Sequence, residues 1–429
     1  MRVNAAELGG LPDGTMVELV GWLRSKRLHG KLLFLDLRDS TGVVQVTVKA
    51  SNVSEQGFAK AASAGRESAL KIVGLVRHDE RAPGGVEVSG TEIEVISPSI
   101  EEFPVKKGVG PMFLSLNRHL AIRSPKAAAI LRFRAKLVKC LREWLEKEGF
   151  VEVHCPTFIT AAVEGGATLF PVDYFDKKVY LTQSVQFYQE AAIYALEKVY
   201  SIQPSFRAER SKTRRHLTEF WHVEAEMAHA GLEELLKVVE RLVGEASTEA
   251  VRISAGELRV LDRKVDLTML EHPYPRIRYS EALEILERKG VSVPWGSDLG
   301  ADEERVLTME FEKPFFLTHF PRQAKAFYHK PDPSNPTLTL SADLLAPSGY
   351  GEIVGGGQRI HDYHELLNRI EEEGLNPEDY KWYLDLRKYG TVPHCGFGLG
   401  VERLVQWLLG LKNIRSAAMF PRTPKRIYP

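Results

Sequence analysis

Apolar and polar residues alternate in five short segments near the start of the chain, namely residues 16–24, 31–39, 42–50, 69–78 and 86–97. A period of two is typical of half-buried strands, and Gly, Asp and Pro mark the turns between them. A helical stretch separates the third segment from the fourth. Five strands with a helix after the third follow the order of an OB-fold barrel. The pattern therefore predicts a small β-barrel domain over residues 1–102.

The outward positions of this barrel suggest one kind of ligand. Leu33 and Leu35 of the second segment point inward, which leaves Phe34 outside, and Val44 and Val46 of the third segment leave Gln45 outside in the same way. An outward aromatic ring beside an outward amide is how single-stranded bases are stacked and read. A lone surface phenylalanine on a small barrel would give the same pattern, so alternation alone leaves the two interpretations equal.

The rest of the chain reads as a second, larger domain. Residues 103–124 are rich in Pro and Gly and break both periodicities, which predicts a linker. An amphipathic helix over residues 127–147 follows, and then a strand that stops at Pro156. The helix expected over residues 233–246 is assigned a peripheral role. Because the later strands are joined mostly by hairpins or long insertions, we expect an α+β domain over residues 125–429, with a mainly antiparallel sheet flanked by helices.

The most informative stretch of this domain is residues 200–227, which reads as a hairpin with a basic loop at its tip. The first run carries polar side chains on one face, namely Ser201, Gln203, Ser205, Arg207 and Glu209. The second run does the same with Phe220, His222, Glu224 and Glu226. Such a face suits a ligand with several phosphates and a cationic head. Charge alternation alone, however, favours a solvated antiparallel edge.

Two further motifs lie near the end of the chain. In FGLGVER, Gly398 and Gly400 let a flat ring approach the strand, and Arg403 is placed to lay its guanidinium over a purine. In the other motif, Asp343 and Glu352 fall on neighbouring strand ends with glycines between them. Hard oxygen ligands favour magnesium over zinc. Taken alone, the glycine pair is weak evidence, because packing glycines are common, and an acidic turn with a surface arginine is the better explanation of the second motif.

Composition narrows the class of protein. The 429 residues include 57 Lys plus Arg and 57 Asp plus Glu, so any nucleic-acid contact must come from local patches. The isolated cysteines, Cys140, Cys155 and Cys395, argue against a zinc site or a disulfide scaffold. The N-terminus lacks a signal pattern, and no apolar run approaches the roughly 18 residues of a membrane span. We expect a cytoplasmic protein without a membrane segment.

Taken together, the motifs carry a family resemblance. FRAE at residues 206–209, RHLTEF at 215–220 and GLGVER at 398–403 stand in the order of the second and third signatures of one enzyme class, and the helix and strand ending at Pro156 match its first. The chain resembles the class II aminoacyl-tRNA synthetases of the aspartate, asparagine and lysine subgroup over essentially its whole length, barrel included. The HIGH and KMSKS signatures of the other class do not occur.

The resemblance implies an ATP-dependent, AMP- and pyrophosphate-forming ligase that is a homodimer through the helix and strand ending at Pro156. Arg207 and Arg403 would be catalytic, the former holding the α-phosphate, with adenine between Phe220 and Arg403. Mg²⁺ would be held by Asp343 and Glu352 only, because Gly355 replaces a serine of the aspartate enzymes. Phe34 and Gln45 would contact the anticodon. The full implied ATP set is Arg207, Glu209, Arg215, His216, Leu217, Phe220, Glu352, Gly400, Glu402 and Arg403.

The amino acid is a separate question. The implied set is Glu164, Gln183, Ser184, Gln186, Glu190, Arg207 and Arg359. Aspartate enzymes typically carry QSPQLFKQ, whose lysine neutralises the substrate carboxylate; here Gln189 takes that position and Glu190 follows it. A substrate amide would donate to Glu190 and accept from Arg359, whereas an aspartate would bring two carboxylates together at a cost of roughly several kcal/mol.

The stretch DLLAPSGYGEIVGGGQR at residues 343–359 also resembles the archaeal asparagine enzymes. We therefore expect L-asparagine and tRNA(Asn) as substrates. Three alternatives stay open: an aspartate enzyme that also charges the asparagine tRNA, a paralogue that makes free asparagine through the same adenylate, and a pure nucleic-acid-binding module. The barrel argues against the paralogue, and Asp343, Glu352 and Arg403 together argue against the module.

Overall fold

The computed structural model describes residues 1–163, 169–210 and 213–429. The chain divides into two compact units, Met1–Leu114 and Ser115–Pro429. The division falls within the segment that the sequence predicts as a linker. Each unit has its own hydrophobic core.

The first unit is the predicted OB-fold. Its strands close into a barrel in the order β1-β2-β3-β5-β4, and the helix α1 lies between β3 and β4 in sequence. The Ser54 hydroxyl caps α1 by accepting from the Gly57 amide. The bounds are β1 Met16–His29, β2 Leu32–Arg38, β3 Val43–Lys49, α1 Glu55–Ser63, β4 Ala69–His78 and β5 Val86–Ser97, preceded by the 3-10 helix η1 Ala5–Gly10.

The segment predicted as a linker is more structured than its composition suggests. Phe103 and Val105 are buried, and Arg66 joins them to the barrel: its guanidinium lies over the Phe103 ring and donates to the Val105 carbonyl. Two short helices follow, α2 (Pro111–Leu116) and α3 (Arg118–Ala121). Pro and Gly therefore mark turns here rather than an extended connection.

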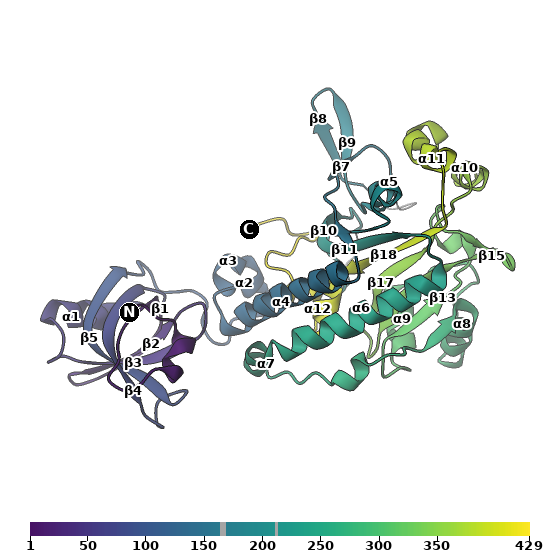
Figure 1. Cartoon of the computed structure of the whole chain (residues 1–429). Helices are drawn as coiled ribbons and strands as arrows, with labels where there is room; N and C mark the ends of the chain where they lie inside the picture. Colours follow the sequence, from purple (N-terminus) through teal and green to yellow (C-terminus); the bar gives the residue numbers. More distant parts are fainter. Residues whose placement is uncertain (164–168, 211–212) are drawn as a thin grey trace. The chain divides into compact units, whose positions relative to one another are not determined.

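The second unit is built on an eight-stranded sheet of order β12-β13-β16-β17-β18-β11-β10-β6 (Figure 1). Only the two outermost pairs, β12 with β13 and β10 with β6, are parallel among these strands, so the prediction of a mainly antiparallel sheet is confirmed. The bounds are β6 Val151–Glu152, β10 Lys198–Phe206, β11 Glu219–Ala228, β12 Arg276–Arg278, β13 Phe315–Thr318, β16 Ser341–Ala346, β17 Gly351–Gln358 and β18 His394–Gly400.

Two long helices, α4 (Pro125–Lys147) and α6 (Leu232–Arg252), run side by side over one face of this sheet (Figure 1). The apolar positions of α4 form the predicted stripe, and Ser124 caps its start. The expectation that the second of these helices is peripheral is wrong, because α6 buries a long apolar face against the centre of the sheet.

The remaining elements surround the sheet (Figure 1). A small sheet of order β7-β9-β8 precedes α5, which packs on β10 and β11. No helix in the described ranges is long and apolar enough to cross a membrane. The bounds are β7 Phe158–Ile159, β8 Pro171–Tyr174, β9 Lys177–Leu181, α5 Gln186–Leu196, α7 Ala255–Leu261, η2 Leu267–Leu270, α8 Tyr279–Arg288, α9 Ala301–Thr308, η3 Arg322–Ala324, β14 Pro331–Asp332, β15 Asn335–Thr339, α10 Tyr363–Glu372, η4 Pro377–Tyr380, α11 Lys381–Lys388, α12 Val401–Leu408 and η5 Ile414–Ser416.

Candidate active site

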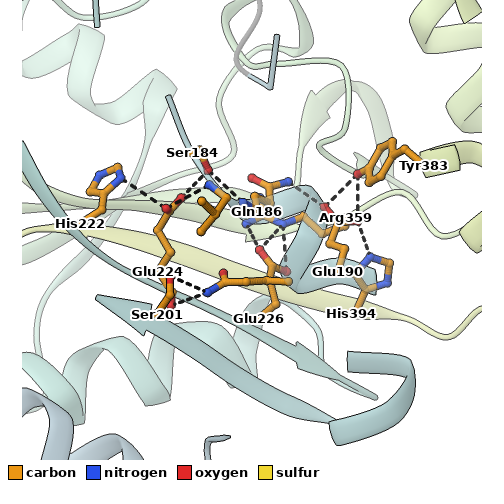
Figure 2. Close-up of polar contacts among 12 residues, drawn as sticks. Ser184, Gln186, Glu190, Ser201, His222, Glu224, Glu226, Arg359, Tyr383 and His394 are labelled. Atoms are coloured by element: carbon orange, nitrogen blue, oxygen red, sulfur yellow. Dashed lines mark hydrogen bonds and ion pairs between the residues drawn. The ribbon is translucent and has the colours of Figure 1, made fainter. Parts of the chain in front are cut away.

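The strand β11 separates the core from a cavity by the alternation of its side chains. Val223 and Ala225 pack in the core beneath α6, while His222, Glu224 and Glu226 line a cavity of about 270 Å³ on the opposite face. All three polar side chains are buried. The polar face of the hairpin is therefore an enclosed wall rather than the solvated edge that charge alternation favours (Figure 2).

The residues predicted to bind ATP line a second cavity that adjoins the first. Arg207, His222, Glu352 and Gly398 border both. The strand β10 ends at Phe206, so Arg207 and Glu209 stand in the loop beyond it and not on the strand face expected from alternation. The members of the predicted ATP set in the wall of the second cavity are Arg207, Glu209, Arg215, His216, Leu217, Phe220, Glu352, Gly400, Glu402 and Arg403.

Arginines from distant segments converge on this cavity. Arg403 Nη1, on α12, lies 2.9 Å from Glu352 Oε2, and the Arg207 guanidinium carbon lies 5.5 Å from the centroid of the Phe220 ring. Arg215 Nη2 donates to Glu304 Oε2 at 2.8 Å. The Nε and Nη1 atoms of Arg215 are buried without a partner among the described residues, so this guanidinium keeps donors for a ligand.

Two histidines of the hairpin are held neutral. Burial, and after it the nearby positive charge of Arg403, lower the pKa of His216 to about 4. Burial and the charge of Arg207 lower the pKa of His222 to about 3. At neutral pH both rings therefore act as neutral hydrogen-bonding groups rather than as cations.

Glu402 connects three elements. Its Oε1 accepts from Arg134 Nη2 at 2.7 Å, and its Oε2 accepts from the backbone N–H of Trp221 at 2.9 Å. Burial raises the pKa of Glu402, which Arg134 opposes. Although Glu402 borders the cavity, both of its oxygens are used to join α12 to α4 and β11, so it positions Arg403 from behind.

The two predicted metal ligands meet over a glycine. Asp343 on β16 is the register partner of Gly355 on β17. A Cβ on Gly355 would lie 3.4 Å from Asp343 Oδ1 and 3.2 Å from Glu352 Oε1. Two carboxylates that converge over open backbone fit a nucleotide-borne Mg²⁺, because that ion takes one or two protein carboxylates plus phosphates and waters. The described residues hold no cluster of three or more acidic, His or Cys ligands.

At the other end of the first cavity, Glu226 and Arg359 form a buried pair (Figure 2). Arg359 Nη2 donates to Glu226 Oε1 at 2.6 Å, and its Nε lies 3.2 Å from Oε1 and 3.4 Å from Oε2. Burial raises the pKa of Glu226, and Arg359 opposes this shift. The contact to Oε2 is the weaker, so this oxygen retains accepting capacity toward the cavity.

Glu190 differs from the prediction that it faces the substrate amide. It lies on α5 outside the cavity wall, and its carboxylate is completely buried. Gln186 Nε2 donates to Oε1 at 2.8 Å, Tyr383 Oη lies 2.8 Å from both oxygens, and His394 Nε2 lies 2.9 Å from Oε2 (Figure 2). Arg387 pairs with the same Oε2. Burial alone would raise the pKa of Glu190, but Arg387 and His394 outweigh it and hold the pKa well below its usual range.

The other residues of the predicted amino-acid set also divide into those that line the first cavity and those that lie outside its wall. Ser184, Gln186 and Arg359 line the first cavity, as does Gln189, whereas Gln183 is buried outside its wall. The Gln189 Nε2 donates to the Glu224 carbonyl at 3.0 Å, and its Oε1 has no hydrogen-bond partner among the described residues. Glu164 lies outside the residues that the structure describes.

In the barrel, the proposed base-reading residues are neighbours on β2 and β3. Phe34 lies beside Arg27, whose guanidinium carbon is 5.5 Å from the ring centroid. Gln45 is more enclosed than its outward position predicts, with 7% of its surface exposed. Gln45 Oε1 accepts from Arg27 Nη2, and Gln45 Nε2 donates to Glu87, each at 2.9 Å. The amide of Gln45 is therefore held in one orientation.

Sequence reasoning missed several cavity residues. Glu226 shares the strand face of Glu224, so its alternation was a usable signal. Glu304 lies on α9, in a segment without a motif, and its Oε2 accepts from the Glu352 amide at 2.7 Å. Lys325 follows η3 and donates to Asp343; nothing in its local sequence marks it.

Comparison with known families and structures gives two matches that together span most of the chain. Residues 113–424 match the tRNA synthetases class II (D, K and N). Residues 17–96 match the OB-fold nucleic acid binding domain. The matched segments lie one in each compact unit, apart from the first two residues of the longer match.

Individual relatives cover the whole chain. An asparagine–tRNA ligase of Pyrococcus furiosus is 54% identical, over 100% of this chain and 99% of its own. The crystal structure of asparaginyl-tRNA synthetase from Pyrococcus horikoshii complexed with asparaginyl-adenylate matches with a TM-score of 0.97 at 53% identity, over 100% of both chains. Aspartyl tRNA synthetase from Entamoeba histolytica matches with a TM-score of 0.86 at 28% identity, over 100% of this chain and 93% of its own.

Proposed function

The chain belongs to the class II tRNA synthetases of the aspartate, lysine and asparagine group, and we propose that it activates L-asparagine with ATP and transfers it to tRNA(Asn). Full-length identity of 54% to an asparagine–tRNA ligase supports this reaction. Within the cavity, the observation that carries the choice of amino acid is the buried Glu226–Arg359 pair. It offers one acceptor and one donor, which is what a side-chain amide requires.

In this proposal the substrate amide donates to Glu226 Oε2 and its carbonyl oxygen accepts from Arg359. This reassigns to Glu226 the role that the sequence gave to Glu190. The substrate carboxylate then points along the cavity toward Arg207, which borders both cavities. A substrate with a second carboxylate would instead place a negative charge against Glu226 in a desolvated site. This would cost roughly several kcal/mol, as for a buried unpaired charge.

The nucleotide occupies the second cavity in a bent form. Arg207 holds the α-phosphate, Arg215 and His216 hold the outer phosphates, and the adenine lies between Phe220 and Arg403. Asp343 and Glu352 would hold Mg²⁺, which would neutralise part of the charge on the phosphates. The substrate carboxylate attacks the α-phosphorus, pyrophosphate leaves, and the terminal hydroxyl of the tRNA then attacks the adenylate carbonyl. Positioning and charge stabilisation suffice for these steps, without a covalent nucleophile from the protein.

The other assignments extend the proposal to partners. Phe34 and Gln45 of the barrel contact the anticodon, and the orientation that Arg27 and Glu87 impose on Gln45 supports its use in reading a base. A homodimer forms through the helix and strand that precede Pro156, which are α4 and β6. The family resemblance assigns Glu164, which lies outside the described residues, to the α-amino group of the substrate.

The test is aminoacylation of unfractionated tRNA by the full chain with radiolabelled asparagine or aspartate, followed by identification of the charged tRNA. We expect asparagine to be attached to tRNA(Asn) and no aspartate to be attached to any tRNA. Transfer of aspartate alone would establish the aspartate alternative, and adenylate formation without transfer to any tRNA would favour the free-asparagine paralogue.

A further inference from the structure

A lysine lies among the acidic groups of the first cavity. Lys325 Nζ donates to Asp343 Oδ2 at 2.7 Å, and only 15% of the lysine side chain and 13% of the aspartate side chain is exposed. The same ammonium lies 3.8 Å from the centroid of the Phe320 ring, in the geometry of a cation–π contact. The ammonium is thus fixed from two sides at a carboxylate assigned to the metal.

The surroundings keep this lysine charged. Asp298 and Glu352 also line the cavity. Because a buried ammonium without carboxylate partners would be costly, its position depends on the acidic groups as much as they depend on it.

The neighbouring carboxylates follow the same arrangement. Glu352 is paired with Arg403 at 2.9 Å, and Glu304 is paired with Arg215 at 2.8 Å. Asp343 is paired with Lys325 in the same way. Both proposed metal ligands therefore already have a monovalent cation of the protein as a partner.

A divalent ion at Asp343 would compete with the ammonium. Mg²⁺ binds a carboxylate oxygen at about 2.1 Å. In Asp343, Oδ1 faces Gly355, and the ammonium of Lys325 lies 2.7 Å from the other oxygen, Oδ2. Two cations on one buried carboxylate repel each other with little screening. A nucleotide triphosphate changes this balance, because its negative charges offset the second cation.

We propose that Lys325 is a tethered counter-cation that excludes free divalent ions from Asp343 and so makes metal binding depend on the nucleotide. The inference rests on the proposed magnesium role of Asp343 and Glu352. In the nucleotide-free protein, the ammonium neutralises Asp343 and holds its carboxylate in place. Lys325 acts through Asp343 and is therefore a positioning residue.

The test is a Mn²⁺ titration of the full chain followed by electron paramagnetic resonance, with and without a non-hydrolysable ATP analogue. Without the analogue, Lys325→Met should bind Mn²⁺ at least about tenfold more tightly than the original chain. Lys325→Arg, which keeps the charge, should match the original chain. With the analogue, the difference between the Met variant and the original should shrink to about threefold or less.

Two further variants keep the test decisive. Lys330→Met removes a partly buried lysine paired with Glu365 outside the cavity, and it should leave Mn²⁺ binding unchanged. Should Lys325→Met fail to fold, Lys325→Gln retains an N–H donor to Asp343 and is judged by the same criterion. Equal Mn²⁺ affinity in the neutral variant and the original chain, or equal tightening in Lys325→Arg, would overturn the inference.

Asp343→Asn separates this inference from the proposed metal site. With the analogue present, this variant should weaken Mn²⁺ binding. If it weakens binding while the neutral Lys325 variants do not tighten it, only the role of Lys325 is wrong. If Asp343→Asn leaves binding unchanged, the metal assignment itself is wrong.

Discussion

The two cavities of the candidate site differ in how their charged groups are paired. We call the first cavity the amino-acid end and the second cavity the nucleotide end. At the amino-acid end, Arg359 in the cavity wall is paired with Glu226, and behind it Arg387 is paired with Glu190. At the nucleotide end, the hairpin and its loop bring Arg207, Arg215 and Arg403 to one cavity. Arg215 there keeps two buried nitrogens without a partner in the described parts of the chain.

This difference corresponds to the two proposed ligands. A neutral amide is read most selectively by groups whose own charges are balanced, because any added charge on the ligand is then uncompensated. A triphosphate instead requires donors that are not yet used. Arginine and glutamate side chains thus favour a neutral ligand at the amino-acid end and an anionic ligand at the nucleotide end.

The largest effect is expected at the nucleotide end. Arg207→Ala should lower ATP–pyrophosphate exchange by at least about 10³-fold, because it removes the cation proposed to stabilise charge on the α-phosphate. The adjacent Arg210 is exposed, and Arg210→Ala is the matched control with an expected change below about threefold. Near-normal exchange in Arg207→Ala would contradict the proposed role of Arg207 in holding the α-phosphate.

At the amino-acid end, Glu226→Gln should lower kcat/KM for asparagine in the exchange assay by about 10²-fold, since a charge-assisted hydrogen bond is lost. It should also narrow the preference for asparagine over aspartate, because the repelling charge is gone. Glu190→Gln makes the same change in an equally buried carboxylate outside the cavity, and it should keep the preference. An unchanged preference in Glu226→Gln, or a lost one in Glu190→Gln, would reverse the assignment.

Glu190→Gln should affect stability instead. It leaves the buried Arg387 without its carboxylate, which typically costs about 3–5 kcal/mol. Urea denaturation at fixed protein concentration measures the loss. A change below about 1 kcal/mol would show that this cluster does not hold α5 to α11 as the contacts indicate.

These residues also show what the sequence could and could not predict. The barrel followed from alternation because each of its strands buries one face locally. Glu190 was predicted to face the substrate, but neighbours on a helix point about 100° apart, so Gln189 lines the cavity while Glu190 points toward α11. The periodicity of residues 233–246 revealed the helix but not its partner, which is the distant sheet.

The nucleotide-binding residues were predicted from motifs whose spacing is local. Glu304 and Lys325 reach the cavity from segments without a motif, and only the tertiary fold brings them to Glu352 and Asp343. The enclosure of Gln45 has the same origin, because Glu87 is 42 residues away in the chain. Pairings between distant segments leave no periodic signal.

The smallest effect concerns His222, which borders both cavities. Its pKa falls from 6.5 to about 3 in the folded chain, chiefly through burial and then through the charge of Arg207. The unfolded chain therefore binds this proton first as pH falls, and stability decreases below pH 6.5 at about 1.4 kcal/mol per unit. His222→Asn should reduce the loss between pH 7 and 5.5 by about 1–1.5 kcal/mol in urea denaturation. Identical pH slopes would contradict this.

The central claim is that the amino-acid end reads a neutral amide. ATP–pyrophosphate exchange of the original chain with asparagine and with aspartate, compared as kcat/KM at the same pH and salt, tests it most directly. The account predicts a preference for asparagine of at least about 10³-fold, because aspartate would bury a second carboxylate against Glu226. Exchange with aspartate at an equal or greater kcat/KM would contradict it.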